Sequence, residues 1–214
     1  MKRILTMAAA LAGLVMTGAA AVPDGEGFVS LFNGQDLRGW IGATQSYAVE
    51  EGVLYSKPDK AGNLMLAKQY GDFVLRFDFL LTANGNNGVM VRMKEVEGGG
   101  TKNGMELQIL DDDGDQHKKL ADYQYNGSIY GVAPAKRGFL KPLGQWNAQE
   151  VRAVGSRITV VLNGTVIVDK DLKEVQKTLD GKEHPCLHNA KGYLGFMAHH
   201  SRVGFRNIRI KEVQ

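Results

Sequence analysis

Short alternations of apolar and polar residues recur along this chain, and they constrain its fold more than any other feature. In segment 73–81 every second residue is large and apolar, whereas Arg76 and Asp78 take the opposite face. A period of two residues is that of a β-strand with one buried face. The chain therefore predicts strands that each cover one side of a core.

Two later segments repeat this alternation and carry charged residues on their polar face. In segment 89–93, Arg92 lies opposite three apolar residues: Val89, Val91 and Met93. In segment 105–109, Glu106 and Gln108 lie opposite three more: Met105, Leu107 and Ile109. If these strands are neighbours of segment 73–81, then Asp78, Arg92, Glu106 and Gln108 gather on one outward face.

Turn signals separate the predicted strands. Segments 158–162 and 165–169 flank Asn163-Gly164, a pair that favours a tight hairpin because both residues tolerate a positive φ angle. Segments 192–198 and 203–210 predict two further strands, and only segment 172–179 predicts a short helix. With 27 glycines for turns, the pattern predicts an all-β fold, an antiparallel two-sheet β-sandwich or jelly roll with one short helix.

The first residues have the pattern of an export signal. Lys2 and Arg3 precede an apolar stretch that ends in small residues at Ala19–Ala21, as in a secretory signal peptide. We expect cleavage near Ala21, an exported periplasmic or secreted product, and one domain over residues 22–214 without a membrane span. An uncleaved membrane anchor is the alternative, although the apolar run is short for one.

Charge and motifs exclude several classes of function. Removing Lys2 and Arg3 lowers the formal charge from +3 to +1, so nothing favours nucleic-acid binding. The single cysteine, Cys186, cannot form an internal disulfide. The motifs of phosphate-binding loops, dinucleotide-binding folds and serine hydrolases are absent from the sequence.

The predicted polar face has the chemistry of a sugar site. Carboxylates accept hydrogen bonds from hydroxyl groups or move protons, while Arg and amide groups orient oxygen atoms. His199 follows the strand predicted at 192–198 and could reach this face as a base or a metal ligand. The alternative is an ordinary solvated sheet face, and the spacing by itself leaves both open.

Nine segments, in order along the chain, resemble the bacterial 3-keto-disaccharide hydrolase family. They are GFVSLFNGQDLRGW (27–40), YGDF (70–73), NNGV (86–89) with Arg92, NGMELQILD (103–111), GSIYG (127–131), AKR (135–137), Trp146-Asn147, LNG (162–164) and FRNI (205–208). The resemblance implies a jelly roll of the concanavalin-A-like, laminin-G-like type. It also implies a hydrolase that acts on 3-keto-glycosides or 3-keto-disaccharides.

A ketone at sugar carbon 3 suggests how such an enzyme works. It acidifies the hydrogen at carbon 2, so a base can remove that hydrogen and the aglycone leaves from carbon 1. Water then adds, and the net result is hydrolysis. The route needs a base, an acid at the leaving oxygen and an electrophile at the ketone, and the resemblance is compatible with one divalent metal ion at the site.

The resemblance and the predicted faces together suggest roles for eight residues. Glu106 and His199 are the expected base, acid or metal ligands, Arg92 is expected to bind the keto oxygen, and Asp78 to support Arg92. The expected substrate contacts are Asn87, Gln108, Tyr130 and Lys136. Met197 departs from the family pattern, which often has a polar residue two positions before the histidine.

Two other functions fit the same fold. One is a carbohydrate-binding jelly roll without catalysis. The other is a retaining glucanase, although its Glu-x-Asp motif is broken by Gln108. Fold alone does not choose among them.

Overall fold

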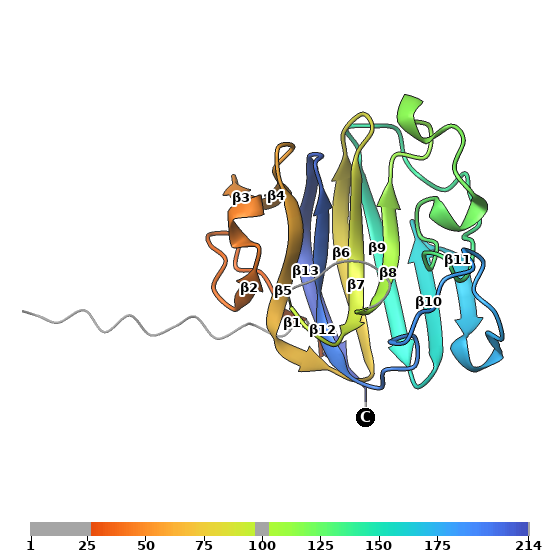
Figure 1. Cartoon of the computed structure of the whole chain (residues 1–214). Coiled ribbons are helices and arrows are strands. Elements are labelled where there is room, and N and C mark those ends of the chain that lie inside the picture. Colours follow the sequence, from red (N-terminus) through yellow and green to blue (C-terminus); the bar gives the residue numbers. More distant parts are fainter. Residues whose placement is uncertain (1–26, 97–102, 214) are drawn as a thin grey trace, which may run out of the picture.

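The computed structural model describes residues 27–96 and 103–213, which form two antiparallel β-sheets packed face to face (Figure 1). The signal peptide predicted at residues 1–21 lies outside the described residues. Within the described ranges, no helix is long and apolar enough to cross a membrane.

The larger sheet has eight strands. In spatial order it runs β11 (Thr165–Asp171), β10 (Arg157–Leu162), β9 (Trp146–Val154), β6 (Phe73–Leu81), β13 (Val203–Glu212), β4 (Val53–Ser56) and β3 (Tyr47–Glu50), and β1 (Val29–Ser30) also pairs with β13. The smaller sheet has five strands, in the order β2 (Trp40–Gly42), β5 (Ala61–Tyr70), β12 (Gly192–His199), β7 (Asn86–Met93) and β8 (Met105–Leu110).

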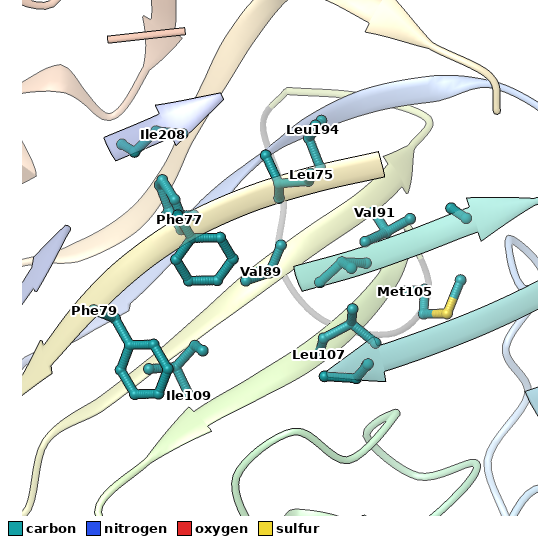
Figure 2. Packing of buried hydrophobic residues seen from close by; sticks show 14 of the residues in the cluster. Leu75, Phe77, Phe79, Val89, Val91, Met105, Leu107, Ile109, Leu194 and Ile208 are labelled. Carbon is teal, nitrogen blue, oxygen red and sulfur yellow. The ribbon is translucent and has the colours of Figure 1, made fainter. Parts of the chain in front are cut away.

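The core lies between the sheets and is built by the alternation seen in the sequence. Figure 2 shows Phe77 and Phe79 of β6 facing Val89 of β7 and Ile109 of β8, and all four are at most 1% exposed. Phe196 of β12 stacks on Phe205 of β13 with ring centroids 4.0 Å apart. Such burial of large apolar side chains is the main force that holds two sheets together. The prediction of an all-β sandwich is confirmed.

The predicted hairpin is also confirmed. β10 and β11 pair directly across Asn163 and Gly164, whose φ angles are 50° and 87°. Both angles lie in the left-handed region that this type of turn requires.

The predicted helix at 172–179 is wrong. The structure has only a 3₁₀ turn, η4 (Leu172–Glu174), after which Val175 is extended. The carboxylate of Asp171 accepts a hydrogen bond from the amide of Lys173 and caps this turn. A single capped turn followed by extended backbone does not nucleate a longer helix.

Alternation fails at the end of β7. The pairing of β7 with β12 shifts between Tyr193 and Gly195, and Arg92 has a φ angle of 52°. A bulge of this kind reverses the faces of the residues beyond it. Met93 therefore joins the outward-facing side chains of Met65 and Met90, and the prediction that Met93 faces inward and Arg92 outward is wrong.

Candidate active site

The polar face of β8 lies on the outer side of the five-stranded sheet but is shielded from solvent. After β8 the chain returns along its edge (Figure 1), so that the amide of Tyr130 donates to the carbonyl of Glu106 and the amide of Gln108 donates to the carbonyl of Ser128, both at 3.0 Å. Tyr130 consequently stands opposite Glu106. Glu106 and Gln108 are only 6% and 4% exposed.

Glu106 meets His199 across this face. Nε2 of His199, at the end of β12, lies 3.3 Å from Oε1 of Glu106. The two residues are 93 positions apart in the sequence, and β7 lies between their strands. The glutamate side chain is 7% exposed and the histidine side chain 36%, so the imidazole is the group that a substrate meets first.

A missing side chain makes this contact possible. Gly88 of β7 pairs with both Gln108 and Met197 and therefore lies between β8 and β12. A Cβ atom at Gly88 would stand 2.4 Å from Oε1 of Glu106. The carboxylate thus occupies the space that any other residue at position 88 would fill.

The pair has the chemistry of an acid–base unit. When Nε2–H donates to the carboxylate, Nδ1 is left as the basic nitrogen of a neutral imidazole. Once Nδ1 takes a proton, the adjacent carboxylate stabilises the imidazolium. The pair can therefore accept a proton from a bound molecule and return it.

A cavity of about 490 Å³ adjoins His199. It lies between β2 with the following turn η1 (Thr44–Ser46), the start of β5 and the end of β12, and Val96 closes one side. Met197 lines it as well. Met197 belongs to a cluster of buried methionines, with Met65, Met90 and Met93, on the outer face of the sheet.

The structure does not bring Arg92 or Asp78 to this site. Arg92 is 3% exposed, and its Nη2 donates to Oδ1 of Asp72 at 2.8 Å. Burial lowers the pKa of this guanidinium, while the charge of Asp72 opposes that shift. Asp78 is on the outer face of the other sheet, where its Oδ2 accepts from Nδ2 of Asn207 at 2.7 Å. The expected gathering of these residues with Glu106 is wrong, because Asp78 lies on β6 of the other sheet and the bulge in β7 turns Arg92 away from the outer face.

The expected substrate contacts are spread over several places. Gln108 shares the face of Glu106, and its Nε2 donates to Oδ1 of Asn86 at 3.0 Å. The hydroxyl of Tyr130 accepts from Nε2 of Gln124 at 2.8 Å. Asn87 is fully buried, on the strand face opposite to Gly88. Lys136 is exposed beside β11, where its amide donates to the carbonyl of Ile167.

A metal ion would find two protein ligands here. Among residues 27–96 and 103–213 there is no cluster of three or more His, Cys, Asp or Glu side chains suited to a metal. The Glu106 oxygen and the His199 nitrogen suit a divalent ion, which would complete its coordination with water and substrate oxygens. The metal predicted at this pair stays a prediction.

Sequence reasoning missed the two residues that shape the surroundings of the pair. Gly88 and Met197 both lie between β8 and β5, and neither was assigned a role. A glycine inside an alternating strand often marks a close approach of another group. That signal was present at Gly88, but the group that approaches it comes from a different strand.

The chain is similar in sequence to known proteins. A family described as the 3-keto-alpha-glucoside-1,2-lyase-like domain matches residues 27–211. A protein of Bacteroides thetaiotaomicron named 3-keto-disaccharide hydrolase is 23% identical over 88% of this chain and 79% of its own length.

Solved structures show the same fold. A candidate glycosyl hydrolase from Parabacteroides distasonis superposes with a TM-score of 0.77 at 26% identity, over 87% of this chain and 99% of its own. A carbohydrate-binding module from Bacillus subtilis superposes with a TM-score of 0.54 at 14% identity, over 81% of this chain and 96% of its own. At that lower identity the likeness concerns the fold alone.

Proposed function

The chain belongs to the family of 3-keto-alpha-glucoside-1,2-lyase-like domains, and from this premise we propose that it hydrolyses glycosides whose sugar carries a ketone at carbon 3. The observation that carries the proposal is the contact between Glu106 and His199, at 3.3 Å, beside a cavity that reaches the histidine. The name of the Bacteroides relative supports a hydrolase of this class.

The reaction starts with proton removal. Nδ1 of His199 takes the hydrogen from carbon 2 of the sugar, and the electron pair of that C–H bond is delocalised onto the keto oxygen as an enolate. Glu106 stabilises the imidazolium that forms. The ketone makes this step feasible, because without it the carbanion at carbon 2 has no oxygen to carry its charge.

The aglycone leaves in the second step. The enolate re-forms the ketone, a double bond forms between carbons 1 and 2, and the bond from carbon 1 to the leaving oxygen breaks. That oxygen keeps the electron pair and takes the proton from His199. Water then adds its hydroxyl to carbon 1 and a proton to carbon 2, so that the products are the free 3-keto sugar and an alcohol.

The charge on the keto oxygen needs a partner other than Arg92, whose guanidinium is held at the edge of the sandwich. If Glu106 and His199 held a divalent ion instead, that ion would supply positive charge there, and His199 would then be a ligand and not the base. Adding a chelator to the activity assay tests separately whether a divalent ion is needed.

One assay tests the proposal. The purified protein is incubated with a 3-keto-glucoside and with its unoxidised parent, each with and without a chelator, and the released aglycone is measured. We expect release from the keto compound alone. Release from the parent would indicate an ordinary glycosidase, and binding without release would indicate a carbohydrate-binding module.

Two variants test whether the activity depends on Glu106. Glu106→Gln should lower kcat by about a hundredfold or more, the range that loss of an acid–base group produces. Glu150→Gln, on the outer face of the other sheet, is the matched control and should keep normal turnover. Near-normal turnover by Glu106→Gln in a folded protein would refute the assignment.

A further inference from the structure

The cavity beside His199 is the open approach to the acid–base pair. Glu106 is covered on its other side by the chain that returns along β8, and its side chain is only 7% exposed. The cavity ends at His199 and at the adjoining residues Met197 and Ala198. A substrate bound at the pair would therefore extend into this cavity.

Met197 forms the boundary between the pair and the cavity. In the sheet register it lies between Gly88, over which the Glu106 carboxylate lies, and Asn63 of β5. Its neighbours on this outer face are the thioethers of Met65 and Met90, both fully buried. Met197 is the methionine of this cluster that lines the cavity, and the buried Met65 and Met90 pack beside it.

The polar side chains of the cavity are few, and two of them have partners. Nδ2 of Asn63 donates to the carbonyl of Val96 at 3.3 Å, and His199 faces Glu106. Gln45 is exposed at the rim. A second sugar seated over Met197 would bury hydroxyl groups against thioethers, which costs free energy for each lost hydrogen bond.

An aromatic ring gains from the same surface. Methionine sulfur makes favourable contacts with aromatic rings, and the unbranched side chain adapts to a flat face. Resting on the function proposed above, we propose that this cavity binds the leaving group of the glycoside, and that the preferred leaving group is a phenol whose ring lies against Met197.

The chemistry agrees with this preference. In the elimination step the leaving oxygen takes the electron pair of the bond from carbon 1. A phenol oxygen, with a pKa of about 10, accepts that pair more readily than the oxygen of a sugar alcohol does. His199 then delivers the proton it removed from carbon 2, and the released phenol is neutral.

The test compares two substrates that share the same 3-keto-glucose unit, one a phenyl glycoside and the other a disaccharide. Met197→Gln should lower kcat/KM for the phenyl compound about tenfold and should not lower that for the disaccharide, because the amide can hydrogen-bond the hydroxyl groups of the second sugar. Met197→Leu keeps the apolar volume and should keep the preference. Met65→Leu, in the same cluster but away from the cavity, is the matched control. Comparison of variant with wild type cancels the intrinsic reactivity of the two substrates.

A binding measurement tests the aromatic site without requiring that the protein cleave a substrate. With methionine methyl groups labelled with ¹³C, titration with phenol should shift the Met197 signal and leave that of Met65 in place. If neither keto compound is cleaved but this shift occurs, the proposed function fails and the aromatic site stands. If Met197→Gln changes both substrates equally, or the Met197 signal does not move, the aromatic site is refuted.

Discussion

The position of the Glu106 carboxylate depends on the smallest residue of β7. Because Gly88 has no side chain, the carboxylate can lie across this strand and reach Nε2 of His199. The sequence shows a glycine in a strand, and the structure shows which group uses the space. The acid–base pair is therefore a product of three residues, of which only two carry reactive groups.

Replacing Gly88 with Ala tests this directly. The added methyl would meet Oε1 of Glu106 at 2.4 Å, so the carboxylate must move away from His199. We expect kcat for a 3-keto-glucoside to fall about a hundredfold, since displacement of a reacting group by about 1 Å has effects of this size.

Gly204→Ala is the matched control for this change. On the outer face of the other sheet, a Cβ at Gly204 would meet the ring of Tyr55 at 2.7 Å, so a similar packing cost should appear without loss of turnover. Equal losses in both variants would show that destabilisation, and not the carboxylate position, lowers the activity.

Among the elements, the connection from η4 to β12 supports the chain that covers Glu106. The amide of Leu179 donates to the carbonyl of Gly131 at 2.7 Å, next to Tyr130. Within this connection Nε2 of His184 lies 3.1 Å from both carboxylate oxygens of Asp180, and both side chains are at most 5% exposed. The residues that follow the predicted helix at 172–179 are thus held by a buried ionisable pair.

The pair predicts a pH dependence of stability. Burial raises the pKa of Asp180, but hydrogen bonds from the amide of Lys182 and from His184 outweigh it, so the pKa lies below its ordinary value. A lowered carboxyl pKa adds stability above the unfolded pKa of about 4, and this stability is lost as the pH falls through the lower folded value.

We therefore expect Asp180→Asn to unfold at a lower urea concentration than wild type at about pH 6, with the difference shrinking toward about pH 3. Urea midpoints at the two pH values check this. A difference that stays constant with pH would mean that the carboxylate charge contributes nothing.

In the molecule as a whole, hydrogen bonds from Arg92 link several connections at one edge of the sandwich. Its guanidinium donates to the carbonyl of Gly71 between β5 and β6, to that of Gly155 between β9 and β10, and to that of Asn189 before β12. These connections belong to both sheets. The bulge that turns Arg92 away from the outer face is what allows this role.

Arg92→Met should therefore reduce stability and leave the chemistry intact. Four carbonyls, that of Ala153 included, and the Asp72 carboxylate lose a buried donor. The free energy of unfolding should therefore fall by about 3 kcal/mol, measured by urea denaturation. Turnover well below the melting temperature should stay near normal. If Arg92→Met is folded but inactive, the result would instead support the expectation that Arg92 binds the substrate.

Arg157→Met serves as the control, because the ion pair of Arg157 with Asp169 is exposed. Its loss should lower stability much less. A similar loss in both variants would argue against a special role for the buried guanidinium.

Side-chain alternation and turn residues were enough to predict the strands, the apolar faces and the β-sandwich, because they act over a few neighbouring positions. The family resemblance also indicated Glu106 and His199 as candidates. Which strands are neighbours is set by the packing of the whole chain. That packing separates Asp78 from Glu106, turns Arg92 to the edge of the sandwich, and places Gly88 and Met197 beside the pair. Strand order and the bulge in β7 depend on how the whole core packs, and no local pattern records that packing.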